Sequence, residues 1–91
     1  MDSPSSSQLR VLVVEDDQVT ARDLEETLKR RGFIVVGVAH DEHEARRLAE
    51  AEDPRIALVD VRLDNLDVGI SLAKDLRAVH GVVVIFVTGY S

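Results

Sequence analysis

The stretch Ile56–Asp60, with the sequence Ile-Ala-Leu-Val-Asp, is a short apolar run that ends on a single carboxylate. Pro54 stands two residues before the run. An apolar run of this length predicts a buried strand of a parallel sheet. Asp60 is therefore expected at the carboxyl edge of that sheet, where open α/β folds place their binding sites.

Two other apolar runs also end on polar residues. Val11–Val14 is followed by Glu-Asp-Asp at 15–17, and Val82–Val87 is followed by Thr-Gly at 88–89. If these runs are parallel neighbours of the first strand, their ends bring at least three carboxylates and a hydroxyl to one edge. The sequence therefore predicts a functional site at that edge.

The composition is that of a single small globular domain. The chain has 91 residues, a net charge of −6 and no cysteine, which excludes disulfides and thiolate metal sites. It contains no apolar stretch of membrane-spanning length and no signal-peptide pattern, so we expect a cytoplasmic protein. The acidic balance argues against direct nucleic-acid binding.

Alternating strands and helices predict an α/β fold, a doubly wound parallel sheet with helices on both faces. Residues 1–8 are expected to be a disordered tail and residues 9–91 to be the domain. Strands are predicted at 9–14, 33–38, 56–60 and 82–87, and helices after Asp17, after Asp41 and after Leu66. The residues predicted to face inward on the helices are Val19, Ala21, Leu24, Leu28, Ala45, Leu48, Ala49, Ile70, Leu72, Ala73, Leu76 and Val79.

Clustered carboxylates repel one another, so such a site binds a hard cation or takes up protons. Oxygen ligands without His or Cys favour Mg²⁺ or Mn²⁺ over zinc. A Mg²⁺ ion held by carboxylates keeps positions open for phosphate oxygens, which suits phosphoryl transfer. Asp60 is the best candidate for a nucleophile that becomes an aspartyl phosphate, because it stands alone at the end of the most buried strand.

Simpler interpretations exist for each of these residues. Asp17 fits a helix N-cap, Glu15 and Asp16 fit solvated loop acids, and Thr88 alone fits an ordinary strand end. Arg62 fits a surface residue, and Val82–Val87 fits the core. Solvated positions are expected for the three histidines, His40, His43 and His80.

Three motifs together resemble the receiver domain of two-component response regulators. They are Val-Leu-Val-Val-Glu-Asp-Asp at 11–17, Ala-Leu-Val-Asp-Val-Arg-Leu at 57–63 and Ile-Phe-Val-Thr-Gly at 85–89. The resemblance runs from about Leu9 to Ser91. It implies a flavodoxin-like receiver fold with strand order 2-1-3-4.

The resemblance also implies roles for the acids. Asp60 would be the phosphoacceptor, and Glu15, Asp16 and Asp60 would bind Mg²⁺ together with the backbone carbonyl of Arg62. A sensor histidine kinase or a histidine phosphotransfer protein would be the donor. The domain would then be a signalling module rather than a conventional enzyme, with self-catalysed phosphorylation and slow hydrolysis only.

Further positions acquire roles in the same way. Thr88 would be the switch hydroxyl, and Gly89 would leave room for the phosphoryl group to enter. Arg62 and Tyr90, each two residues after a site residue, would lie at the mouth of the site.

The sequence departs from the family pattern at two places. The loop after Asp60 is one residue longer than the commonest receiver loop and lacks its proline, as in a subset of receivers, and Phe-Val-Thr-Gly-Tyr resembles stand-alone receivers. A complete receiver continues through a helix, a fifth strand with a lysine and an aromatic residue, and a last helix. No residue of this sequence matches those later elements.

Two other functions stay open at this point. One is a non-phosphorylated interaction or oligomerisation module on the receiver scaffold. The other is a phosphohydrolase, which is disfavoured because Arg62 stands where one phosphatase family has a second carboxylate. The long apolar strand also predicts a homo-oligomer that associates through Val82–Ser91.

Overall fold

The computed structural model describes residues 9–61 and 66–87. These residues form a four-stranded parallel sheet in the order β2-β1-β3-β4, as predicted, with three helices between the strands. The predicted tail at residues 1–8 lies outside the described residues. The elements are β1 (Arg10–Val14), α1 (Gln18–Arg30), β2 (Ile34–Ala39), α2 (Glu42–Glu52), β3 (Ile56–Asp60), α3 (Leu66–His80) and β4 (Val83–Val87).

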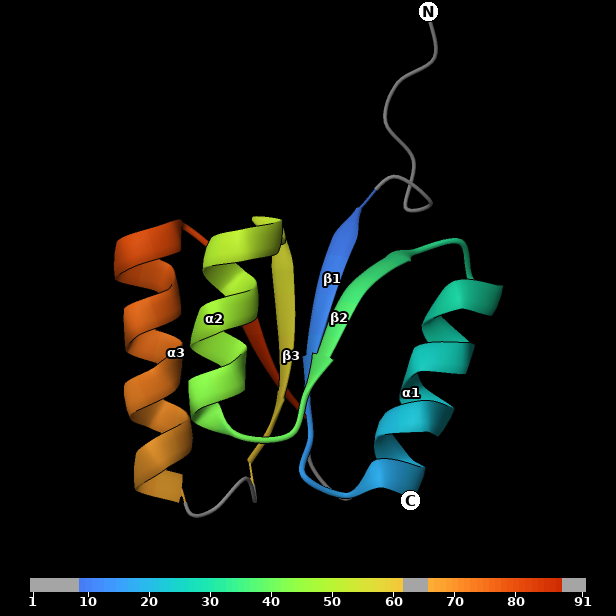
Figure 1. Cartoon of the computed structure of the whole chain (residues 1–91), viewed down its shortest axis with the longest axis horizontal. Coiled ribbons are helices and arrows are strands. Elements are labelled where there is room, and N and C mark those ends of the chain that lie inside the picture. The colour runs from blue at the N-terminus through green and yellow to red at the C-terminus, as the bar shows by residue number, and fades with distance from the viewer. Residues whose placement is uncertain (1–8, 62–65, 88–91) are drawn as a thin grey trace, which may run out of the picture.

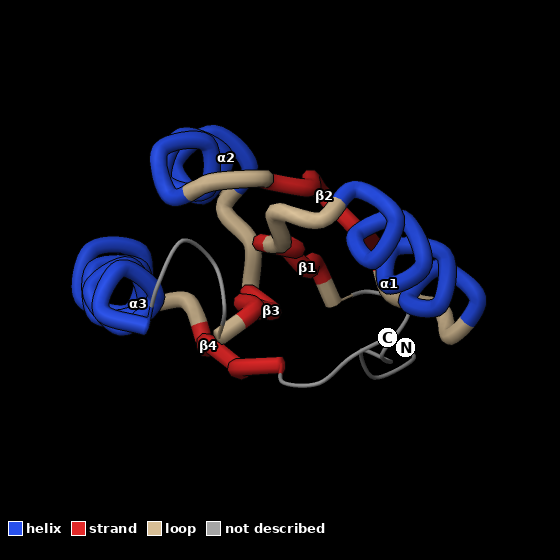
Figure 2. Tube along the Cα trace, turned by 90° about the horizontal axis from the view of Figure 1, so that it is seen from below, coloured by secondary structure: helices blue, strands red, loops and turns tan. Residues whose placement is uncertain are grey.

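Helices cover both faces of the sheet, as the alternation of strands and helices predicted. Helix α1 packs over β1 and β2 on one face, while α2 and α3 lie side by side on the other (Figures 1 and 2). No helix in the described ranges is both long and apolar enough to span a bilayer.

The core lies between the sheet and the pair α2 and α3. Glycine at position 37 in β2 allows α2 to approach closely, because a Cβ atom there would stand only 3.0 Å from a methyl group of Leu48. The buried core residues are Leu12, Val14, Ala39, Ala45, Ala49, Ala57, Val59, Leu72, Leu76 and Val82. Their burial holds the carboxyl ends of β1 and β3 in a fixed relation.

Capping residues set the bounds of the helices. The carboxylates of Asp17 and Asp41 each accept a hydrogen bond from the backbone N–H three residues further on, at 3.0 and 2.8 Å. Gly32 and Gly81 follow α1 and α3 with φ angles of 93° and 68°, which a glycine adopts without strain. The two capping aspartates agree with the helix starts predicted after Asp17 and after Asp41.

Three predicted inner residues are exposed: Val19 (70%), Ile70 (39%) and Val79 (72%). Val19 stands two residues before the buried Ala21, so it points about 200° away around the helix. Ile70 is likewise two residues before the buried Leu72. Val79 borders a groove of about 370 Å³ between α2 and α3, which polar side chains such as Arg46 and Glu50 also line.

Strand β4 is only partly covered. Val82, just before it, is buried and Val84 packs against the core, whereas Val83, Ile85 and Phe86 are exposed by 53%, 46% and 40%. Among the described strands, β4 pairs only with β3. One flank and much of one face of this apolar strand are therefore open in the part of the chain that the structure describes.

Candidate functional site

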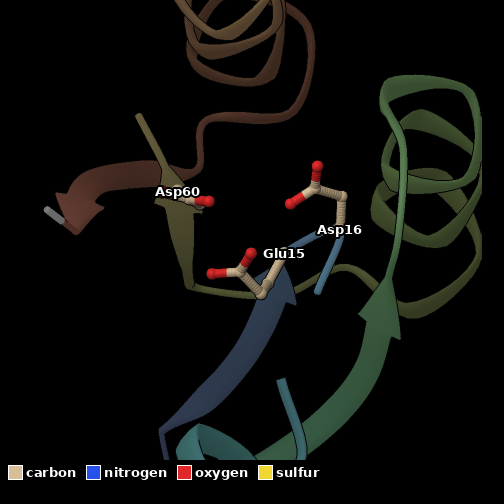
Figure 3. A group of neighbouring side chains, drawn as sticks. All are labelled: Glu15, Asp16 and Asp60. Carbon is tan, nitrogen blue, oxygen red and sulfur yellow. The ribbon is translucent and has the colours of Figure 1, made fainter. Parts of the chain in front are cut away.

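The candidate site forms where β1 and β3 end side by side. Val14 of β1 pairs with Val59 of β3, so Glu15 and Asp60 follow at neighbouring positions. One carboxylate oxygen each from Glu15, Asp16 and Asp60 lie within 4.8 Å of one another. Figure 3 shows the three side chains directed toward a common space. The structure thus brings together the three acids selected from the sequence.

Glu15 is the most unusual member of the group, because only 6% of it is exposed. Burial raises the pKa of its carboxyl to about 7, and hydrogen bonds with Asp60 and Asp16 act in the same direction. The backbone N–H of Asp17 opposes this by donating to Glu15 Oε2 at 3.1 Å. In the absence of a cation, Glu15 therefore holds its proton more tightly than an ordinary glutamate does.

Asp17 has a different role. Its carboxylate accepts hydrogen bonds from the hydroxyl and the backbone N–H of Thr20 at the start of α1. These two bonds lower the pKa of the Asp17 carboxyl. The interpretation of Asp17 as an N-cap is confirmed, and it does not belong to the acidic group.

His40 contributes a contact that the sequence did not reveal. It was predicted to be solvated, and its side chain is exposed, but its Nδ1 lies 3.1 Å from the backbone oxygen of Glu15. The signal that could have found it is the pairing of β1 with β2, in which Val14 faces Ala39. That register places Glu15, which follows β1, next to His40, which follows β2.

Four predicted site residues, Arg62, Thr88, Gly89 and Tyr90, lie outside the described residues. The strand that leads to Thr88 is in place, since Asp60 pairs with Val87.

The donor set fits a hard divalent cation. All three groups offer carboxylate oxygens, the ligands that Mg²⁺, Mn²⁺ and Ca²⁺ take in proteins. A bound cation would favour the ionised form of Glu15 and would replace its proton. The group could therefore hold a metal ion.

Comparison with known proteins matches this chain to one protein family. The family model described as the response regulator receiver domain matches residues 11–91. The transcriptional regulatory protein PdtaR of Mycobacterium tuberculosis is 32% identical over 99% of this chain, which corresponds to 43% of the relative. This chain thus spans less than half the length of the curated relatives it matches.

Solved structures agree with the observed fold. The signal receiver domain of a modulated diguanylate cyclase from Desulfovibrio desulfuricans superimposes with a TM-score of 0.83 at 36% identity, covering 90% of this chain and 66% of that one. The anti-anti-sigma factor PhyR of Bartonella quintana, in complex with the anti-sigma factor NepR, gives a TM-score of 0.77 at 31% identity, covering 85% and 32%.

Proposed function

The chain belongs to the response regulator receiver domain family, and we propose on that premise that it accepts a phosphoryl group on Asp60. The observation that carries the proposal is the convergence of Glu15 and Asp16 on Asp60 within 4.8 Å. Asp60 ends β3, which lies between β1 and β4 in the sheet, and it pairs with Val87 of β4.

In the proposed reaction, a carboxylate oxygen of Asp60 attacks the phosphorus atom of a phosphohistidine on the donor. An O–P bond forms and the P–N bond breaks, and the histidine of the donor leaves with the electron pair and a proton from solvent. Such transfer depends on positioning and charge neutralisation more than on covalent chemistry by the protein. The attacking group is the carboxylate form of Asp60, which supplies an oxygen lone pair to phosphorus.

Glu15, Asp16 and Asp60 would hold Mg²⁺ or Mn²⁺, with the backbone carbonyl of Arg62 as a further ligand. The bound ion would supply neutralisation of the negative charge on the phosphoryl oxygens. Thr88 is proposed as the switch hydroxyl, beside the small residue Gly89. These roles of Arg62, Thr88 and Gly89 rest on the family pattern and on their sequence positions.

Receiver domains interact with kinases or phosphotransfer proteins, and this domain is a signalling module rather than a conventional enzyme. We propose a sensor histidine kinase or a histidine phosphotransfer protein as its donor. Slow hydrolysis of the aspartyl phosphate would end the signal. The chain would act in the cytoplasm.

Intact-mass measurement tests the function. The chain is incubated with Mg²⁺ and a small acyl phosphate, which replaces the protein donor. The expected result is a gain of one phosphoryl group that requires Mg²⁺ and is lost in Asp60→Asn. An unchanged mass of the folded wild type, or a gain that survives Asp60→Asn, would contradict the proposal.

A second candidate function, association through β4, is favoured by the exposure of Val83, Ile85 and Phe86. The strand is apolar, carries no charge and is unpaired on one side among the described strands, which is the pattern that pairs with another strand. We propose that two copies of this chain associate through Val82–Ser91. The complex of PhyR with an anti-sigma factor supports the wider alternative, that a receiver-containing chain binds partners directly.

A further inference from the structure

We infer that His40 is a positioning residue that fixes the peptide unit between Glu15 and Asp16, and so sets how their two carboxylates face a cation. The inference rests on the proposed function of the acidic site. It assigns a task to a residue that lies outside the carboxylate group.

The contact determines which ring atom carries the proton. A backbone carbonyl oxygen only accepts, so the 3.1 Å contact with the oxygen of Glu15 requires a proton on Nδ1 of His40. The neutral Nδ1–H tautomer and the imidazolium ion both meet this requirement.

The bonded carbonyl belongs to the peptide unit that joins Glu15 to Asp16. Rotation of that unit changes ψ of Glu15 and φ of Asp16 together, and would move one carboxylate relative to the other. The N–H of Glu15 is held as well, because it donates to the oxygen of Ala39 at 2.9 Å. Both backbone polar groups of Glu15 are thus bound to the last residue of β2 and the residue after it.

His40 is itself held by the start of α2. Its backbone N–H donates to Glu44 Oε1 at 2.9 Å, and the N–H of Glu44 donates to Asp41 Oδ1 at 2.8 Å. Helix α2 packs on both β1 and β2. A continuous series of hydrogen bonds therefore links the first turn of α2 to the backbone of Glu15.

The side chain of Glu15 depends on this support. Its carboxylate accepts from the N–H of Asp17 at 3.1 Å, which requires the backbone from 15 to 17 to keep its path. Release of the Glu15 carbonyl would loosen that bond and widen the range of separations between the carboxylates of Glu15 and Asp16. Residues that orient metal ligands in this way typically change metal affinity 10- to 100-fold when they are removed.

The test compares His40→Ala with His40→Asn and with the control His43→Ala. An asparagine amide can place its N–H close to the position of Nδ1. His43 is exposed in the first turn of α2, and its side chain forms no hydrogen bond or ion pair with the described residues. Mg²⁺ affinity is measured by calorimetry, and amide exchange of Asp17 is measured without metal. Urea unfolding records any loss of global stability.

We expect His40→Ala to weaken Mg²⁺ binding on the order of 10-fold and to speed exchange of the Asp17 N–H, with little change in the urea midpoint. His40→Asn and His43→Ala should keep wild-type values. Wild-type values of Asp17 amide exchange and Mg²⁺ affinity in His40→Ala would overturn the inference. A loss of Mg²⁺ affinity that only matches a loss of global stability in urea would overturn it as well.

A second pair of variants tests the support from α2. Glu44→Gln retains an oxygen that can accept from the His40 N–H, while Glu44→Ala removes it, so only Glu44→Ala should speed exchange at Asp17. Equal exchange in both would contradict the link to α2. If the wild type binds no Mg²⁺, the proposed function fails, and the exchange measurements without metal still decide the role of His40.

Discussion

Glu15 follows β1 and Asp60 ends β3, and these two strands are paired and parallel. A carboxylate oxygen of Glu15 and one of Asp60 lie within 4.8 Å of each other at the same edge of the sheet. Glu15 is buried there, and its pKa is raised to about 7. Two acids held this close are stable near neutral pH when a proton or a cation separates their charges. The folded core therefore maintains an arrangement that a divalent cation can stabilise.

The raised pKa of Glu15 predicts how stability depends on pH without divalent cations. Below the ordinary pKa of 4.5 the carboxyl is protonated in both states, so the shift has no effect. Between 4.5 and about 7 the unfolded state loses the proton first, so the free energy of unfolding falls as pH rises. The loss attributable to Glu15 is at most about 3 kcal/mol.

Urea unfolding in the presence of a chelator, from pH 5 to pH 8, checks this. Glu15→Gln should unfold at a higher urea concentration than the wild type at pH 8, and the difference should shrink toward pH 5. Glu26→Gln, which changes an exposed acid of α1, is the control. Parallel pH profiles for Glu15→Gln and the wild type would contradict the assignment.

Mg²⁺ is predicted to stabilise the fold, because it binds the assembled acids and not the dispersed acids of the unfolded chain. At a free concentration of roughly ten times Kd the gain is about 1.4 kcal/mol. Thermal melts with and without Mg²⁺ measure it. Asp16→Asn should lose most of the response, while Asp23→Asn, which alters an exposed acid of α1, should keep it. Superimposable wild-type melts would show that the site binds no Mg²⁺.

The aspartyl phosphate is predicted to decay slowly. Arg62 follows Asp60 by two residues and Tyr90 follows Thr88 by two, so both are expected at the mouth of the site, where attacking water must pass. An arginine can pair with phosphate oxygens and a tyrosine can obstruct water. The double variant Arg62→Ala, Tyr90→Ala should lose the phosphoryl group faster in a time course of intact mass. Equal decay rates in the wild type and the double variant would show that neither residue slows hydrolysis of the aspartyl phosphate.

Association through β4 is predicted to be sensitive to charge on its exposed face. Ile85→Lys is the suitable change, because Ile85 is 46% exposed whereas Val84 packs against the core and a lysine there would unfold the chain. Sedimentation at tens of micromolar, on the order of ordinary working concentrations, should show a dimer or larger assembly for the wild type and a monomer for Ile85→Lys.

Glu26→Lys, on an exposed position of α1, should leave the assembly intact. The neighbouring Glu25 is unsuitable as a control because it pairs with Lys29 at 3.0 Å. A stable wild-type monomer at these concentrations would refute the association.

The sequence predicted the sheet and the acidic group well, because both follow from short apolar runs whose ends meet at one edge. The prediction that Val19 and Ile70 face inward was wrong. It relied on their hydrophobicity, but each lies two residues before a buried residue and therefore points to another side of its helix. The sequence also missed the ring of His40 on Glu15, because a contact between side chain and backbone depends on strand register and leaves no pattern in composition. The register of β1 against β2 is known only from the structure.

The central claim is that Asp60 itself carries the phosphoryl group, and the direct measurement is the location of the modified residue. The chain is phosphorylated with a small acyl phosphate and Mg²⁺, reduced with borohydride, which converts an aspartyl phosphate to homoserine, and digested for tandem mass spectrometry. We expect homoserine at position 60 and nowhere else, and none when Mg²⁺ is chelated. Homoserine at position 16, or unmodified aspartate at position 60 in a chain that has gained a phosphoryl group, would contradict it.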